Sequence, residues 1–127
     1  MDSAQKIGAN VVLERDSKVV LQLRDDLFKW GIFGGLVAGG EDPKATVLRE
    51  ISEELTISVE PARLSLLRIF EGDAHVTHLF RYPLRTELEG AVLTEGVRFA
   101  LFAQGDLEPE EVIPWHMHML DWYWNGA

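Results

Sequence analysis

A glycine-rich loop that leads into an acidic helix constrains the fold of this 127-residue chain more than any other feature. Gly35 is followed by Glu41, and then by Glu50, Glu53 and Glu54 in a segment with helical periodicity. At 100° per residue, the last three glutamates fall within one arc of about 100° on the helix surface. Like charges at this spacing cost roughly 0.2–0.5 kcal/mol per pair. Repulsion between the glutamates without a structural gain indicates a functional reason for their spacing. Carboxylates gathered in this way indicate a site for a hard divalent cation.

The predicted helix begins at Asp42 and Pro43, an N-cap residue followed by proline in the first turn, and it ends near Leu55. A second arc of this helix is apolar and consists of Val47, Leu48, Ile51 and Leu55. We therefore expect one side of the helix to pack on the core while the acidic side faces a cleft.

Other segments have the alternation or composition of β-strands. They are residues 9–14, 18–24, 64–70, 76–84 and 97–102. The alternation in 18–24 predicts a half-buried strand, 30–33 is a short apolar segment that enters the glycine loop, and 115–124 is a predicted final helix. This order predicts an α/β or α+β fold, with a mixed sheet and packed helices, in a single domain over residues 1–127.

The composition restricts the classes of function. The chain has 46% hydrophobic and 26% charged residues, as an ordinary globular protein does, and no apolar run approaches the ~20 residues that cross a bilayer. The N-terminal residues lack the basic and apolar regions of a signal peptide. The absence of cysteine excludes disulfides, thiolate metal sites and cysteine nucleophiles. We expect a cytoplasmic protein with no membrane contact.

The charge balance restricts the partners. A formal net charge of −9 argues against long nucleic acid, for which lysine and arginine supply most of the affinity. A phosphorylated small molecule remains compatible, because a bound metal ion reverses the local sign of the charge. A homodimer is left open.

The loop and helix together resemble the signature of the Nudix hydrolases. That signature is a Gly, five residues, a Glu, seven residues, Arg-Glu, an aliphatic residue, any residue, Glu-Glu, any residue, Gly and an aliphatic residue. Eight positions match in register, namely Gly35, Glu41, Arg49, Glu50, Ile51, Glu53, Glu54 and Ile57. Thr56 replaces the last Gly, and Phe33 replaces Pro in the preceding Trp-x-x-Pro-Gly-Gly. The signature covers 23 residues and implies a Nudix-type α/β/α sandwich with a mixed β-sheet between helices.

The resemblance implies a pyrophosphohydrolase that uses Mg²⁺ or Mn²⁺. Its substrate would be a nucleoside triphosphate or a nucleoside diphosphate linked to another group, and water would attack one phosphorus of the diphosphate link. Glu50 and Glu54 would coordinate the metal, and Glu53 would complete the shell or bind through water. The carbonyl of Gly35 would be a further ligand, because glycine leaves the approach open. Glu41 would support these ligands from outside the coordination shell.

Two further charged residues are candidates for catalysis. Arg49 lies four residues before Glu53 and would hold that carboxylate in place, although an ordinary surface ion pair is the alternative. In many relatives an acidic residue outside the signature supplies a ligand or the general base, and Glu95 lies where one is expected. An exposed loop glutamate is the alternative, and the choice of base between Glu50 and Glu95 stays open.

Three residues are candidates for substrate binding. Arg24 follows the second strand and could contact a phosphate in bidentate fashion, although a plain surface arginine fits equally well. Trp30 could stack on a base, but packing in the core is the favoured interpretation. Gly34 is assigned to substrate binding beside Gly35. The four histidines give no plausible chelating pair.

Thr56 carries a separate structural expectation. A β-branched residue at positive φ is an outlier, so we expect Thr56 to keep a negative φ and the helix to end differently from its relatives.

Two other functions remain open from the sequence. A nucleotide- or sugar-nucleotide-sensing module could use the same fold without turnover, but its hallmark is the loss of signature carboxylates, and none is lost here. A plain acidic interaction domain is disfavoured by the glycine loop. The sequence does not identify the nucleotide, the leaving group or the phosphorus that is attacked.

Overall fold

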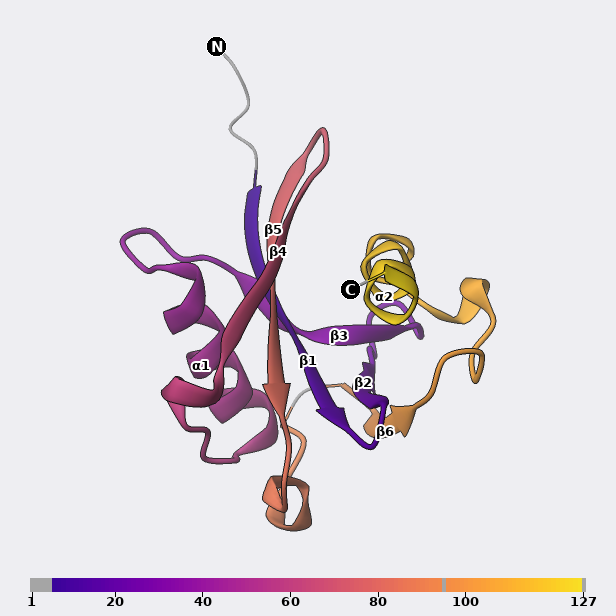
Figure 1. The fold of residues 1–127 in the computed structure, drawn as a ribbon, viewed down its shortest axis with the longest axis horizontal. Helices are drawn as coiled ribbons and strands as arrows, with labels where there is room; N and C mark the ends of the chain where they lie inside the picture. Colours follow the sequence, from indigo (N-terminus) through magenta and orange to yellow (C-terminus); the bar gives the residue numbers. More distant parts are fainter. Residues whose placement is uncertain (1–5, 95, 127) are drawn as a thin grey trace.

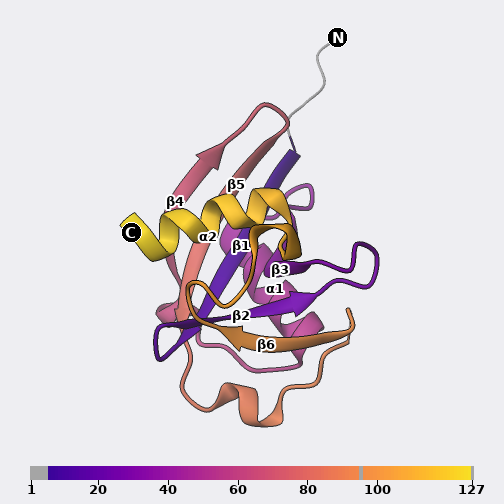
Figure 2. The same ribbon diagram turned by 90° about the vertical axis from the view of Figure 1, so that its right-hand side faces the viewer.

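A mixed sheet lies between two helices in the computed structural model, which describes residues 6–94 and 96–126. Within this part of the chain the strands are β1 (Lys6–Arg15), β2 (Lys18–Leu23), β3 (Trp30–Leu36), β4 (Ser65–Glu71), β5 (His75–Pro83) and β6 (Arg98–Phe102). The helices are α1 (Pro43–Leu55) and α2 (Pro114–Gly126), with short 3₁₀ turns η1 (Pro61–Arg63), η2 (Glu87–Gly90) and η3 (Pro109–Glu111). The two helices lie on opposite sides of the sheet (Figure 1), and α2 crosses one face of it (Figure 2). The predicted α/β/α sandwich is confirmed.

The sheet has the strand order β4-β5-β1-β3-β2-β6. β1 is central, because it pairs in parallel with β5 from Lys6↔His75 to Glu14↔Pro83 and antiparallel with β3. β3 continues through Gly34 and Gly35 to Leu36, whereas the sequence predicted only a short segment that ends at Phe33. The two glycines are therefore part of the sheet, held in register against β1.

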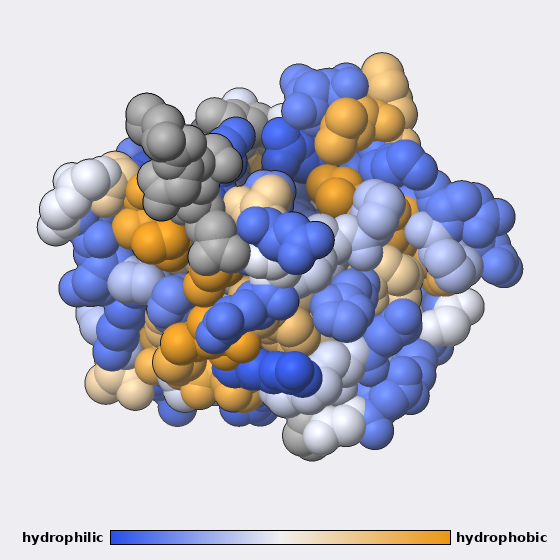
Figure 3. Space-filling view, turned by 90° about the horizontal axis from the view of Figure 1, so that it is seen from above, coloured by the Kyte–Doolittle hydropathy of each residue, from blue (hydrophilic) through white to orange (hydrophobic). Residues whose placement is uncertain are grey.

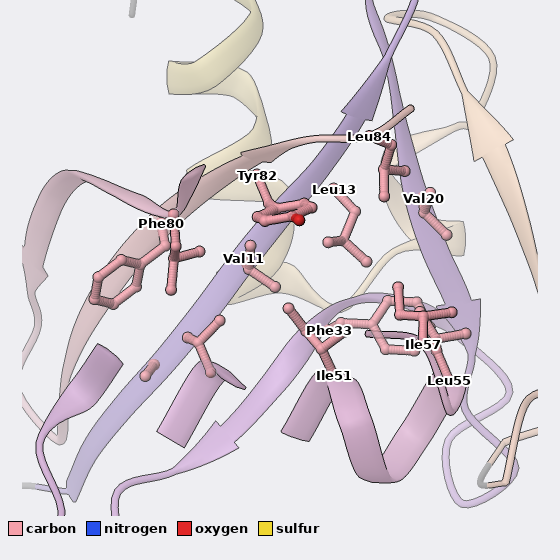
Figure 4. Close-up of a cluster of buried hydrophobic side chains, with 13 residues drawn as sticks. Val11, Leu13, Val20, Phe33, Ile51, Leu55, Ile57, Phe80, Tyr82 and Leu84 are labelled. Carbon is pink, nitrogen blue, oxygen red and sulfur yellow. The ribbon is translucent and has the colours of Figure 1, made fainter. Parts of the chain in front are cut away.

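The core consists of two apolar clusters, one on each face of the sheet. Val11 and Leu13 of β1 belong to the cluster beneath α1, shown in Figure 4, and Val12 belongs to the cluster beneath α2. The strand predicted over residues 18–24 is confirmed as β2, but the prediction that it is half-buried is wrong. Val19 and Leu21 are buried on one face, and Val20 and Gln22 are buried on the other. A strand with both faces covered loses the polar face that alternation implies.

The end of α1 also contradicts the sequence expectation. Thr56 has φ 54° and ψ 33°, which is the left-handed conformation that the glycine of the signature would suit. The negative φ predicted for Thr56 is wrong. Its amide donates to the carbonyl of Ser52 over 3.0 Å, as expected of a left-handed cap.

A distant segment satisfies the last carbonyls of α1. The amide of Val92 donates to the carbonyl of Leu55 (2.9 Å), and the amide of Thr94 donates to that of Glu54 (2.9 Å). The hydroxyl of Thr94 donates to the carbonyl of Glu53 over 2.6 Å. Val92 also donates to the hydroxyl oxygen of Thr56 over 3.2 Å. These contacts hold the helix end and offset the cost of the Thr56 conformation.

The described residues contain no helix with the length and apolar character needed to span a membrane. Seen from above the view of Figure 1, hydrophilic and apolar surface alternate (Figure 3). Ile7, near the start of β1, and Leu36, at the end of β3, are among the exposed apolar side chains.

Candidate active site

A cavity of about 480 Å³ lies where the glycine segment of β3 meets α1. Its lining residues are Gln22, Arg24, Asp25, Asp26, Gly34, Gly35, Leu36, Glu50, Glu54 and Gly96. The structure thus brings together Gly35, Glu50 and Glu54, which the signature assigned to the metal, and Gly34, which was assigned to substrate binding. A larger cavity of about 670 Å³ is lined by Glu14, Arg81 and Tyr123 and includes none of the signature residues.

Gly34 is required by its backbone. It has φ 143°, and a Cβ there would lie 2.1 Å from the carbonyl oxygen of Ala9. Asn10 faces this segment from β1, and its Nδ2 donates to the carbonyls of Ile32 and Phe33 over 3.3 Å each. Sequence reasoning missed Asn10. The available signal was a polar residue inside the apolar run of β1.

Gly35 is required by its neighbour on α1. A Cβ at Gly35 would lie only 2.7 Å from Oε1 and 2.9 Å from Cδ of Glu50. The absent side chain therefore lets the Glu50 carboxylate lie against the backbone of β3, which is the close approach expected of a shared metal site.

Arg49 connects the acidic side chains. Its Nε and Nη2 donate to the two carboxylate oxygens of Glu41 over 2.9 and 3.0 Å. Its Nη1 donates to Glu50 (3.1 Å) and to Glu53 (3.2 Å). The contact with Glu53 matches the proposed orienting geometry, but the bidentate pair is with Glu41, eight residues earlier. Such fork-to-carboxylate pairs fix geometry better than single contacts do.

Glu41 is held in its ionised form by these contacts. Hydrogen bonds from Arg49 and then from the hydroxyl of Thr46, at 2.7 Å, lower the pKa of Glu41 to about 2. The same pairing with Glu41 raises the pKa of Arg49. Sequence reasoning also missed Thr46, which is buried in the first turns of α1.

The three helix glutamates have different environments. Glu54 is only 4% exposed, the side chain of Glu50 is 18% exposed, and that of Glu53 is 60% exposed. Glu50 and Glu54 line the cavity, whereas Glu53 is outside the lining and bonds Arg49. Among the residues that the structure describes, no three acidic or histidine side chains already converge into a metal shell.

The donor set nevertheless fits a hard divalent cation. Carboxylate and carbonyl oxygens are the ligands that Mg²⁺ and Mn²⁺ prefer, and the cavity offers Glu50, Glu54 and the backbone of Gly35. The close approach of Glu50 to Gly35 provides a cradle that any Cβ would fill.

The remaining candidates have mixed placements. Arg24 lines the cavity but forms a bidentate pair with Asp26, at 3.1 and 2.9 Å. Trp30 is buried, and its ring packs edge-on against Phe102 with centroids 4.6 Å apart, which is the favoured core position. Glu95 lies outside the described residues.

The cavity lined by Glu50 and Glu54 is the acidic cavity of the site. A neighbouring cavity of about 310 Å³, the second cavity of the site, shares Arg24, Gly34, Gly35 and Leu36 with it. Its other lining residues are Gly8, Asn10, Ile32, His75, Thr77, Ile113, Trp115 and His116. His116 is a residue that sequence reasoning passed over, because only its pairing with His118 as a chelate was considered.

Comparisons with known proteins agree with the fold. The model of the NUDIX domain family matches residues 4–123. A MutT NUDIX hydrolase from Burkholderia pseudomallei is 25% identical with a TM-score of 0.77, and the alignment covers 94% of this chain and 98% of that one. A NUDIX hydrolase from Nitrosomonas europaea is 20% identical with a TM-score of 0.76, over 94% and 88% of the two chains.

A bifunctional NMN adenylyltransferase/ADP ribose pyrophosphatase from Francisella tularensis, solved with AMP and a Mn ion, is 11% identical with a TM-score of 0.76. The alignment covers 93% of this chain and 40% of that one, so the likeness concerns the fold of one part. No curated protein matches the sequence. The match over residues 4–123 places this chain in the Nudix family, whose hydrolases act on pyrophosphate bonds.

Proposed function

We propose that this chain is a divalent-metal-dependent pyrophosphohydrolase. Its substrate is a nucleoside triphosphate or a nucleoside diphosphate linked to another group, and its metal is Mg²⁺ or Mn²⁺. The observation that carries the proposal is the cavity in which Gly35, Glu50 and Glu54 meet, at the positions of the family signature. The manganese ion and AMP named for the Francisella protein are consistent with this assignment.

Glu50, Glu54 and the carbonyl of Gly35 are the residues that would hold the metal. Glu53 would join them directly or through water, after a small change in its contact with Arg49. Arg49 orients Glu41, Glu50 and Glu53, and its pairing with Glu41 keeps that one carboxylate ionised. When bound, the metal would neutralise charge on phosphate oxygens and lower the pKa of a bound water.

The reaction needs a base, a water molecule and an oriented phosphate chain. A carboxylate takes a proton from water while the water oxygen attacks one phosphorus, and the bond from that phosphorus to the bridging oxygen breaks. The leaving phosphate departs with the bonding electrons. Glu50 lines the cavity and Glu95 is the second candidate for the base. Arg24 lines both cavities and would contact a phosphate if it exchanged Asp26 for the substrate.

The test is a panel of nucleoside triphosphates and nucleoside diphosphate sugars, assayed for phosphate or nucleotide release with Mg²⁺, with Mn²⁺ and with EDTA. We expect at least one substrate to turn over only when metal is present. Glu54→Gln should lower kcat/KM more than about 100-fold, since even residues outside a metal shell contribute about 10–100-fold. Glu71→Gln, an exposed position on β4, is the control and should retain activity.

A thermal melt gives a readout that needs no substrate. Mg²⁺ binds the native state, so the Tm of the parent should rise with Mg²⁺ concentration, and Glu54→Gln should lose that rise. Turnover that persists in EDTA would contradict the proposal. Nucleotide binding without any turnover would favour the sensing module instead. The cytoplasmic location remains a proposal, supported by the cysteine-free composition.

A further inference from the structure

The second cavity differs from the acidic one in its charge. None of the described residues that line it is acidic, and Arg24 is its one arginine or lysine. Ile32, Ile113 and Trp115 give it apolar and aromatic walls. Such a pocket suits an uncharged flat ring better than it suits a phosphate, and the two cavities meet at Gly34 and Gly35.

His116 has a defined tautomer in this pocket. The amide of Ile32 donates to Nδ1 of His116 over 2.9 Å. A neutral imidazole that accepts at Nδ1 carries its proton on Nε2. Burial, with a smaller effect from the charge of Arg24, lowers the pKa of His116 to about 4. The ring is therefore neutral near pH 7, with its N–H at Nε2.

Two neighbouring side-chain donors, on Trp115 and Asn10, are occupied by other protein atoms. Nε1 of Trp115 donates to the hydroxyl oxygen of Thr77 over 2.9 Å. Nδ2 of Asn10 is used by the carbonyls of Ile32 and Phe33. Within residues 6–94 and 96–126, no acceptor pairs with Nε2 of His116. This N–H is consequently a side-chain donor with a fixed direction that the pocket leaves for a ligand, beside the hydroxyl hydrogen of Thr77 and the ring of His75 in the same lining.

We propose that His116 determines substrate specificity by donating a hydrogen bond from Nε2 to an acceptor on the edge of a neutral heteroaromatic ring in this cavity. The phosphates of the same nucleotide extend past Arg24 into the acidic cavity. The inference rests on the proposed function, because it assigns the base of the nucleotide to the second cavity.

The first experiment is nitrogen-15 NMR of the imidazole in the full chain, with guanosine, adenosine, cytidine and uridine as separate probes. We expect the Nε2–H tautomer to persist from about pH 5.5 to about pH 8, the range in which an ordinary histidine changes its charge. At least one nucleoside should shift the Nε2 resonance. A proton on Nδ1, or no shift with any of the four nucleosides, would overturn the proposal.

A variant separates this role from a structural one. In His116→Asn, the side-chain oxygen can still accept from the amide of Ile32, while the NH2 group of the shorter side chain does not reach the position of Nε2. Loss of one neutral hydrogen bond should weaken binding of the responding nucleoside by about 3–10-fold. His118→Asn, at an exposed position two residues along α2, is the control and should bind as the parent does. Equal affinity of His116→Asn and the parent would contradict the assignment.

These measurements use nucleosides without phosphate, so they are independent of turnover. A nucleoside-dependent shift in a protein that hydrolyses nothing would retain the inference as a binding property and reject the hydrolase proposal. Metal-dependent hydrolysis of nucleotides by a protein whose His116 does not respond would retain the hydrolase and reject the role of His116.

Discussion

Replacing Gly35 with alanine tests whether activity depends on the close approach of the Glu50 carboxylate to the backbone of Gly35. Gly35 is absent from the glycines with positive φ, so the backbone accepts alanine without strain. The new Cβ would lie 2.9 Å from Cδ of Glu50. Ordinary contact between carbon atoms begins near about 3.5 Å, so the carboxylate must retreat by about 0.6 Å.

The expected effect is large for activity and small for stability. The group that must move is the end of a flexible side chain, so the free energy of unfolding should change by less than about 1 kcal/mol, and the lower chain entropy of alanine offsets part of the cost. A misplacement of about 1 Å in an active site can cost about 10²-fold, so kcat/KM should fall by about 10–100-fold. The concentration of Mg²⁺ needed for half-maximal activity of Gly35→Ala should be higher than that of the parent.

The measurement combines steady-state kinetics, metal titration and urea unfolding. Gly39→Ala is the matched control, because Gly39 lies in the following loop, has no positive φ and has no atom within 4 Å of the place where a Cβ would lie. If Gly35→Ala and Gly39→Ala have the same activity and metal requirement, the close approach of Glu50 to Gly35 has no part in catalysis. A loss of several kcal/mol of stability in Gly35→Ala would show that the backbone is disrupted, which contradicts a displacement of the Glu50 side chain alone.

Two other predictions concern the ends of α1. Thr56→Gly relieves the left-handed strain and Thr56→Val keeps it, while both variants lose the hydroxyl. The glycine variant should therefore be the more stable by about 1 kcal/mol in urea unfolding. Equal stability of the two variants would show that the conformation is not strained. At the start of the helix, the pKa of Glu41 is lowered to about 2 from 4.5, so its ionised form stabilises the fold above pH 4.5 and that contribution is lost as the pH falls toward 2. Glu41→Gln should therefore lower the free energy of unfolding more at pH 7 than at pH 3, and an equal loss at both values would contradict the pairing with Arg49.

The sequence predicted the parts of the structure that depend on local chemistry. The bounds expected for α1 match Pro43–Leu55, because the Asp42 side chain accepts from the amide of Ala45 at 2.8 Å and Pro43 fixes the first turn. The signature likewise placed Glu50 and Glu54 beside Gly35, since their register is set by one helix and one loop.

Contacts between distant residues were the parts that sequence reasoning missed. The pairing of Arg49 with Glu41 depends on how the loop after β3 returns to α1, and periodicity within the helix favoured Glu53 as the partner. Asn10 lies against Gly34 and donates to the carbonyl of Phe33 only because β1 and β3 are paired in this register. His116 reaches Ile32 because the segment before α2 runs beside β3, where Ile113 donates to the carbonyl of Trp30. None of these contacts between distant residues can be recognised from the spacing of residues within a local segment.

Thr56 shows how a sound local rule fails. A β-branched residue in the left-handed region is disfavoured by roughly 1–2 kcal/mol, and that penalty led to the wrong sign of φ. The competing term comes from a segment far along the sequence, since Val92 and Thr94 donate to the last carbonyls of α1. Those carbonyls belong to the turn that carries Glu53 and Glu54. The same contacts that keep Thr56 in its unfavourable conformation therefore fix the acidic end of the helix against the rest of the chain, so the strain lies where the proposed metal site needs a rigid support.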